Sequence, residues 1–425
     1  MTPLENAILA GISRPGEQEA AVESMDELCR LAETAGASVI ERVLQARKNP
    51  DPATYFGEGK VAEVKALALA TGCELVIIDD ELRPSQQRNL EEAMELKVLD
   101  RTQLILDIFA QRARTGEGKL QVELAQLSYL LPRLVGMGKI LSRLGGGIGT
   151  RGPGESKLES DRRRLRERIS DLGREIDEIA RTRTLHRDKR RKSRAYAVAL
   201  AGYTNAGKSS LFNAMTEGAV YVQDQLFATL DPTVRPILCE KDGAVQLLLS
   251  DTVGFIRKLP HSLVAAFRAT LEEITGADLI LRILDASSPA FEDQLATVDE
   301  VLEEILKRQG LPPLAERATL LVFNKVDLLS AARVKALKEA WPKAFFVSAK
   351  EGKGLEGLVN EIQERSQKGF KAQTYLLPPD KAGLLSKYFA ELAVQKQTWG
   401  PKGVRVEAVL KAPLPELDPF KVAKA

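Results

Sequence analysis

Residues Gly202 to Ser209 have the sequence GYTNAGKS, in which two glycines, a lysine and a serine stand at the spacing of a phosphate-binding P-loop. Gly202 and Gly207 would let the backbone curl so that successive N–H groups point at phosphate oxygens. Lys208 would place a cation beside the β- and γ-phosphates, and the Ser209 hydroxyl would ligate Mg²⁺. The residues expected to bind the phosphates are Gly202, Tyr203, Thr204, Asn205, Ala206, Gly207, Lys208, Ser209 and Ser210.

The segments that follow in the chain favour guanine over adenine. LLLSDTVG (247–254) is an apolar strand pattern that ends at Asp251, which we expect to hold Mg²⁺ through water, and at Gly254, whose N–H can contact the γ-phosphate. ATLLVFNKVD (318–327) ends in Asp327, whose carboxylate can accept from N1–H and the exocyclic amine of guanine. Adenine has a different donor pattern at that edge, so Asp327 should exclude ATP.

Further groups are expected around the base. Asn324 would support the base edge, and the stem of Lys325 would cover the ring. FFVSAK (345–350) is another apolar strand pattern, followed by Ser348, Ala349 and Lys350, whose backbone can meet guanine O6. These elements predict a guanine nucleotide-binding domain over residues 195–367, a P-loop GTPase fold with a mostly parallel sheet flanked by helices and with GTP or GDP and Mg²⁺ as ligands.

Two positions decide how such a site would hydrolyse GTP. DQLFATLDPTVRP (224–236) should supply a threonine that completes Mg²⁺ coordination in the GTP state; Thr229 and Thr233 are both candidates, and we favour Thr229. Phe227, in the same segment, is included among the nucleotide-binding residues. Phe255 follows DTVG, where other GTPases have a glutamine that orients the attacking water. Because a phenyl ring cannot do this, we assign no catalytic side chain and expect slow hydrolysis that a partner accelerates.

The elements that must position these residues occupy a chain of 425 residues, enough for about two to four domains. Three widely spaced cysteines favour reduced thiols in the cytoplasm over a disulfide framework or a zinc site. The sequence shows no signal peptide and no apolar run of membrane-spanning length. We therefore expect a multidomain cytoplasmic protein with no membrane anchor.

Residues 1–115 alternate between helix-like and strand-like segments, which predicts an N-terminal α/β domain with a parallel sheet. The expected helices are 24–35, 60–70 and SQQRNLEEAMEL (85–96), with Ser85 as the N-cap of the last; the expected strands are SVIERVLQ (38–45), ELVIIDDEL (74–82) and the start of KVLDRTQLILDIF (97–109). Residues 368–425 should form a small C-terminal α+β domain from the helix AGLLSKYFAELA (382–393) and the strand VRVEAVLKA (404–412).

Residues 116–194 are predicted to form an antiparallel helical hairpin followed by a basic linker. Leucines at 120, 124, 127, 131 and 134, and an apolar series from Leu158 to Ile179, each follow a heptad pattern too short for a free-standing coiled coil. Each series should therefore bury the other. The Gly136–Lys157 loop between them contains eight glycines and four basic residues, which predicts a flexible loop that orders on a partner, or a plain connector.

Charge is unevenly distributed along the chain. Residues 133–194 contain 19 Lys or Arg and 9 Asp or Glu, a net of +10, whereas the whole chain has a net charge of +2, so the remainder has −8. The Arg181–Arg194 run alone contains eight basic residues and one acid. Basic density of this kind favours contact with nucleic-acid phosphates, although a solvated helical face or a linker is an alternative.

The motifs at Gly202–Ser209, FATLDPT (227–233), DTVGFI (251–256), NKVD and SAK together resemble the HflX family of translational GTPases, which is related to the Obg-like GTPases. FGEGK (56–60), QVELAQLSYLLPRL (121–134) and GGIGTRGPGE (146–155) extend the resemblance over nearly the whole chain. It implies binding to the large ribosomal subunit and its rRNA through the Gly136–Lys157 loop and the Arg181–Arg194 run, with hydrolysis stimulated by ribosomes. Some members split stalled ribosomes, and the family has a hydrophobic residue at the position of Phe255.

Other functions remain as alternatives. A metabolic P-loop kinase conflicts with NKVD and SAK, and a membrane-associated regulator lacks a visible amphipathic anchor. A nucleotide-regulated RNA chaperone or helicase would use the same basic hairpin. Some relatives are reported to use ATP at the N-terminal domain, but residues 1–194 contain no second phosphate-binding motif, so ATP is not expected. Nothing in the sequence suggests an obligate dimer, so we expect a monomer.

Overall fold

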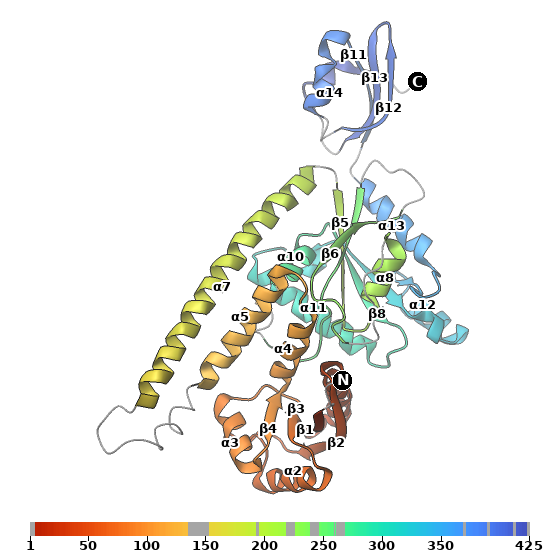
Figure 1. Cartoon of the computed structure of the whole chain (residues 1–425). Coiled ribbons are helices and arrows are strands. Elements are labelled where there is room, and N and C mark those ends of the chain that lie inside the picture. The colour runs from red at the N-terminus through yellow and green to blue at the C-terminus, as the bar shows by residue number, and fades with distance from the viewer. Residues whose placement is uncertain are drawn as a thin grey trace. The chain divides into compact units, whose positions relative to one another are not determined.

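The computed structural model describes residues 5–134, 153–192, 195–217, 226–238, 246–258, 260, 268–368, 371–388, 392–410 and 414–422 (Figure 1). The chain folds as two compact units. The N-terminal unit contains residues 1–179 together with 223–231 and 253–270, and the C-terminal unit contains 180–222, 232–252 and 271–425. Two short segments from the middle of the sequence therefore belong to the N-terminal unit.

The N-terminal α/β domain is a four-stranded parallel sheet with the strand order β2-β1-β3-β4. Its elements are β1 (Glu5–Ser13), α1 (Gln18–Ala35), β2 (Ala37–Ala46), α2 (Glu58–Thr71), β3 (Leu75–Ile78), α3 (Pro84–Met94), β4 (Lys97–Asp100) and α4 (Arg101–Arg112). Helices α2 and α3 cover one face of the sheet, with Val64 and Leu90 packed on Ile8, Val76 and Ile78. The other face contacts α1 and α4. Burial on both faces explains the unbroken apolar sequence of β3.

Three local features differ from the sequence-based expectations. Helix α1 begins six residues before the predicted Ser24, at Gln18, and β1 was not predicted at all. The N-cap of α3 is Arg83, not Ser85, because Pro84 occupies the first helical position, which its fixed φ favours. The Gln86 side chain accepts a hydrogen bond from the backbone N–H of Arg83 at 3.0 Å. This is the bond by which the third helical residue of a capping box holds the N-cap residue, and Ser85 has no part in it.

The two heptad-patterned segments form α5 (Gly116–Arg133) and α7 (Pro153–Lys192), and α7 is one uninterrupted helix (Figure 1). Arg168 of α7 forms a bidentate ion pair with Glu123 of α5, at 2.8 and 3.0 Å. The most buried residues of α5 are not the predicted leucines, which are only half-buried, but Gln121, Val122, Ala125 and Tyr129. Because α5 also contacts α3 and α4, its leucine series is not its only packed face.

Helix α7 also changes two predicted boundaries. Residues 153–157, expected at the end of the Gly136–Lys157 loop, are the first residues of α7. Residues 181–192, expected as a basic linker, continue the same helix. Residues 136–152 of the predicted loop lie outside the described residues. The basic run up to residue 192 is thus an extension of the helix.

The GTPase-type domain is a six-stranded sheet with the order β10-β9-β8-β5-β7-β6, parallel except for the edge pair of β6 and β7. Its strands are β5 (Ala195–Gly202), β6 (Thr233–Pro236), β7 (Gln246–Asp251), β8 (Leu279–Asp285), β9 (Thr319–Asn324) and β10 (Phe345–Phe346). Its helices are α8 (Lys208–Met215), α10 (Arg268–Thr275), α11 (Phe291–Arg308), α12 (Ala331–Ala340) and α13 (Leu355–Gln367). Strand β8, which was not predicted, lies between β5 and β9 and completes the central sheet.

The C-terminal residues form an antiparallel sheet with the order β12-β13-β11-β14, made of β11 (Lys371–Leu377), β12 (Ala393–Gly400), β13 (Gly403–Leu410) and β14 (Lys421–Val422). Its own core includes Tyr375, Val404 and Val406. The predicted helix over 382–393 is reduced to α14 (Gly383–Lys387), and the predicted strand over 404–412 corresponds to β13. Strands β11 and β12 were missed because neither has the alternating apolar pattern of β13.

Candidate nucleotide-binding site

The phosphate-binding loop begins where β5 ends, between the neighbouring strands β7 and β8. Gly202 is the last residue of β5, and a Cβ added there would collide with the carbonyl oxygen of Ile283 in β8. Gly207 has φ +84°, and a Cβ there would collide with the amide of Asn324. Close backbone approach at one glycine and positive φ at the other therefore require both glycines of the motif.

Lys208, the first residue of α8, turns its ammonium group back onto the loop. Its Nζ donates hydrogen bonds to the carbonyl oxygens of Gly202 at 3.1 Å and Tyr203 at 2.8 Å. Burial lowers the pKa of Lys208 to about 8, and the carboxylate of Asp251 opposes that shift. An anion entering the loop would compensate this buried positive charge, because opposite charges attract more strongly where water is excluded.

The other loop residues are arranged around this lysine. Thr204 has a buried hydroxyl with no hydrogen-bond partner among the described residues. Asn205 has φ +61°, while Tyr203 and Ala206 are buried and Ser210 is half-buried in the first turn of α8. An unsatisfied hydroxyl inside a loop of this kind is a polar group available to a ligand.

Ser209 and Asp251 supply oxygen atoms at one point of the site. The Ser209 hydroxyl of α8 donates to Oδ2 of Asp251, at the end of β7, at 2.7 Å. The other carboxylate oxygen of Asp251 accepts from the N–H of Thr252 at 3.0 Å. A hydroxyl and a carboxylate converging beside a phosphate-binding loop are hard oxygen donors of the type that Mg²⁺ prefers. These residues therefore fit the metal expected from the sequence.

Asn324 connects the phosphate-binding loop to the loop after β10. Its Nδ2 donates to the carbonyl oxygens of Ala206 at 3.1 Å and Gly207 at 3.4 Å, and its Oδ1 accepts from the N–H of Ala349 at 3.1 Å. The side chain is buried. Its amide therefore bonds to backbone on both sides, which is a different arrangement from the direct support of a base edge that we expected.

Asp327 and Ser348 lie together at the base end of the site. The Ser348 hydroxyl donates to Oδ1 of Asp327 at 2.6 Å and accepts from the N–H of Glu351 at 3.1 Å. Lys325, with φ +62°, forms an ion pair with Asp285 at 2.7 Å, so its stem is held beside the end of β8. Asp285 was not identified from the sequence, because β8 itself was missed although LILRILD (279–285) is a clear apolar run. Lys350 is exposed.

The remaining candidates divide between the two units. Thr233 begins β6 and pairs with Asp251 across the sheet, so it belongs to the C-terminal unit. Thr229, Gly254 and Phe255 belong to the N-terminal unit. Thr229 and Phe255 are buried there. Phe227, of the same unit, packs edge-to-face on Phe109 of α4, with ring centroids 4.7 Å apart, so its ring has a protein partner.

Comparisons with known proteins identify the family of this chain. Residues 197–325 match a family model described as "50S ribosome-binding GTPase", and residues 22–110 and 112–190 match the N-terminal and middle regions of "GTP-binding GTPase". The chain is 44% identical over 412 residues to GTPase HflX of Escherichia coli K12, covering 96% of this chain and 94% of that protein. It is also 44% identical over 412 residues to GTPase HflX of Caldanaerobacter subterraneus, covering 97% and 92%. The chain belongs to the HflX family of GTPases.

The predicted GTPase fold and GTP-hydrolysing activity are thereby confirmed, and the nucleotide that this HflX GTPase binds is GTP. A structural comparison finds a GTP-binding protein of Sulfolobus solfataricus in complex with GDP, at 25% identity and a TM-score of 0.42, covering 86% of this chain and 99% of that one. In the part of this HflX protein that the structure describes, no helix has the length and hydropathy needed to cross a membrane.

Proposed function

We propose that this protein docks on the large ribosomal subunit in its GTP-bound form, hydrolyses GTP slowly when alone and faster on the ribosome, and leaves after hydrolysis. The observation that most supports this is the match of residues 197–325 to the model described as "50S ribosome-binding GTPase". The relatives named GTPase HflX align with nearly the whole chain. We propose that docking also separates stalled ribosomes into subunits, in the cytoplasm where ribosomes work.

The phosphate end of the proposed site depends on charge. Lys208 would exchange its bonds to the loop carbonyls for the β- and γ-phosphates, and the loop N–H groups and the N-terminus of α8 would surround the same anion. Ser209 and, through water, Asp251 would hold Mg²⁺, with Thr229 as the third protein group in the GTP state. When bound, Mg²⁺ neutralises phosphate charge as the transferring group develops it.

The guanine end depends on hydrogen-bond pattern. The carboxylate of Asp327, oriented by the Ser348 hydroxyl at 2.6 Å, would accept from two N–H groups of guanine. The N–H groups of Ala349 and Lys350 lie on the loop that would meet O6, and the Asn324 amide fixes that loop to the phosphate-binding loop. A base lacking the two donors would leave the Asp327 carboxylate with the Ser348 hydroxyl but without the two N–H groups, which is the physical basis of discrimination.

Phe255 explains why a partner would be needed for hydrolysis. It occupies the position after Gly254 and its ring is buried, so it cannot orient a water molecule by hydrogen bonding. The proposed ribosomal contact is the basic stretch of residues 133–194, by way of the Gly136–Lys157 loop and the Arg181–Arg194 run, bound as a monomer to rRNA phosphates.

The test is co-sedimentation of the full chain with purified large subunits in the presence of a non-hydrolysable GTP analogue, GDP or no nucleotide. We expect binding with the analogue and at least a tenfold higher single-turnover hydrolysis rate with subunits than without. A variant lacking residues 139–152 should bind GTP normally but lose the stimulation. Equal sedimentation in all three nucleotide states, or fast hydrolysis by the protein alone, would contradict the proposal.

A second candidate function is a nucleotide-regulated RNA chaperone or helicase, which the net charge of +10 over residues 133–194 favours. It would bind structured RNA without ribosomes and release it according to nucleotide state. Binding to a ribosome-free RNA duplex that is as tight and as nucleotide-dependent as binding to large subunits would support this function over ribosome docking.

A further inference from the structure

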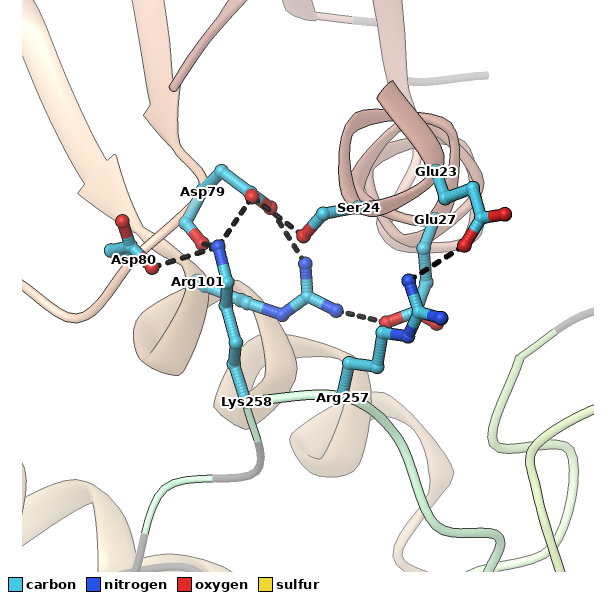
Figure 2. A network of polar contacts seen from close by, with 8 residues as sticks. All are labelled: Glu23, Ser24, Glu27, Asp79, Asp80, Arg101, Arg257 and Lys258. Atoms are coloured by element: carbon cyan, nitrogen blue, oxygen red, sulfur yellow. Dashed lines mark hydrogen bonds and ion pairs between the residues drawn. The ribbon is translucent and has the colours of Figure 1, made fainter. Parts of the chain in front are cut away.

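The segment after Gly254 contains two cationic residues, Arg257 and Lys258, that bind acidic residues of the N-terminal α/β domain (Figure 2). Nζ of Lys258 donates to the carbonyl oxygen of Asp79 at 3.0 Å and to its carboxylate at 2.7 Å, and it lies 2.8 Å from the carboxylate of Asp80. Arg257 pairs with Glu23 of α1 at 2.8 Å. All of these residues belong to the N-terminal unit. Lys258 also has φ +54°, a conformation that a non-glycine residue adopts only at a cost.

These contacts involve buried charge. The Asp79 side chain is 6% exposed; it also accepts from the Ser24 hydroxyl at 2.7 Å and from Arg101 at 2.7 Å. Arg101 is bound on its other side by Glu27. Of the charged residues in Figure 2, four carboxylates and the guanidinium of Arg101 come from the α/β domain. The other two cations, Arg257 and Lys258, come from the segment after Gly254. Each pair has one more exposed partner: Lys258 is 39% exposed beside the buried Asp79, and Glu23 is 43% exposed beside Arg257. The Lys258–Asp79 pair should contribute more, because its carboxylate is the most buried of these charges and Asp80 binds the same ammonium group.

A second segment of the N-terminal unit, 226–231, is attached through a different residue. The carboxylate of Asp231 accepts from the N–H groups of Arg114 at 3.0 Å and Thr115 at 2.9 Å, and from the Thr115 hydroxyl at 2.5 Å. These donors lie at the start of α5, where a carboxylate also complements the helix dipole. A Cβ added at Gly118, in the first turn of α5, would collide with Asp231, so the glycine makes room for this contact.

Each attachment lies close in sequence to a residue of the proposed γ-phosphate site. Asp231 is two residues from Thr229, and Lys258 is four residues from Gly254, so the chain between them can extend only ~7 Å and ~14 Å. Movement of Thr229 or Gly254 beyond the slack in these short links must therefore either strain these contacts or move the elements that make them.

We propose that Lys258 and Asp231 are positioning residues. Lys258 attaches the segment after Gly254 to β3 and α4, and Asp231 attaches segment 226–231 to the start of α5. The N-terminal unit would therefore have a different conformation with GTP bound than with GDP bound. This inference rests on the nucleotide roles proposed for Thr229 and Gly254. The coupling is reciprocal: if nucleotide alters these contacts, altering the contacts must change the ratio of GTP to GDP affinity. The two attachments are separate, so each should respond to its own substitution.

The test is amide hydrogen exchange of the full chain, followed by mass spectrometry, with a non-hydrolysable GTP analogue and with GDP. In the parent protein we expect the two nucleotides to give different exchange in peptides covering 75–104 and 113–122. Lys258→Met should abolish the difference in 75–104 and retain it in 113–122, and Gly118→Ala should do the reverse. Lys258→Arg, which keeps the charge, should behave as the parent does.

The matched control is Lys65→Met, which removes an ion pair with Glu95 elsewhere on the same domain. We expect Lys258→Met to change the ratio of analogue to GDP affinity at least ~5-fold, the lower end of typical couplings, and Lys65→Met to leave it within ~2-fold. If Lys258→Met lowers the melting temperature too far for exchange, Gly118→Ala and Lys258→Arg still test the prediction of separate attachments.

The outcomes separate this inference from the proposed function. If the parent protein binds neither the GTP analogue nor GDP, the proposed nucleotide site is refuted. Nucleotide binding with identical exchange in both states, or an exchange difference and affinity ratio that Lys258→Met and Gly118→Ala leave unchanged, would refute the attachments alone. Neither readout needs ribosomes, so the absence of ribosome binding would not affect the result.

Discussion

Replacement of Arg101 should unfold the N-terminal α/β domain more readily than any exposed charge substitution in it. The Arg101 side chain is 1% exposed and binds the carboxylates of Asp79 and Glu27, which are 6% and 7% exposed. In Arg101→Met the methionine fills much of the space of the arginine stem, but Glu27 and Asp79 lose the guanidinium that both bind, and Asp79 keeps its ion pair with Lys258. Removing one partner of a buried ion pair costs about 3–5 kcal/mol, a large part of the ~5–15 kcal/mol that stabilises a typical domain.

Cysteine reactivity measures this effect locally in the full chain. Cys29 of α1 and Cys73, just before β3, are both buried in this domain. Their labelling by a thiol reagent across a urea series, quantified peptide by peptide, reports unfolding of the α/β domain alone. At an m value of about 1.5 kcal/mol/M, a loss of about 4 kcal/mol lowers the midpoint by about 2–3 M urea.

The control is Arg42→Met. Arg42 pairs with Asp26, but the two side chains are 44% and 53% exposed, so the expected loss is about 0–1 kcal/mol. The triple variant Arg101→Met, Asp79→Asn, Glu27→Gln should recover part of the stability, because it removes the two carboxylate charges that the guanidinium balances in the parent protein. A midpoint for Arg101→Met within about 0.5 M urea of the Arg42→Met value would refute the argument that the carboxylates depend on this guanidinium.

Three further substitutions test the nucleotide site. Gly202→Ala should destabilise the GTPase domain by ~2–4 kcal/mol, because its Cβ would collide with the Ile283 carbonyl. Gly173→Ala has open space around it and lies inside α7, where alanine is favoured over glycine, so it should unfold in thermal denaturation no earlier than the parent. Asp327→Asn should lose at least ~10-fold in GTP affinity and gain affinity for xanthosine triphosphate, whose C2 oxygen can accept from the new amide; unchanged GTP affinity in fluorescence titration would contradict the assigned role. Ser209→Ala should lose the dependence of GTP affinity on added Mg²⁺, which equilibrium titration with and without chelator measures, and a parent-like Mg²⁺ dependence would show that the hydroxyl is not a ligand.

Much of the GTPase domain could be predicted because its chemistry is local. A phosphate-binding loop needs its glycines, lysine and serine within eight residues, so GYTNAGKS is recognisable without knowledge of any distant contact. Apolar runs before GYTNAGKS, DTVG and NKVD predicted β5, β7 and β9 for the same reason. Strand β8 is equally apolar, but no nucleotide-binding motif follows it in the sequence, so it was not predicted.

Contacts between distant parts of the chain could not be predicted in this way. The pairing of Lys258 with Asp79 joins residues 179 positions apart, and that of Asp231 with Thr115 joins residues 116 apart. Each of these side chains in isolation is an ordinary charged or polar residue in a loop. The leucine series of α5 was visible, but which face of the helix is most buried depends on α3 and α4.

Short motifs in the amino-acid sequence determine which chemical groups this protein has, in what order they come, and to which family it belongs. The P-loop, the Asp at a strand end and NKVD can each be recognised alone, because each consists of only a few consecutive residues. The tertiary structure alone determined that the segments flanking the proposed γ-phosphate site belong to the N-terminal unit. The reason is physical: local backbone geometry follows from neighbouring residues, whereas burial and charge compensation, as at Asp79 and Arg101, exist only after distant segments have packed together.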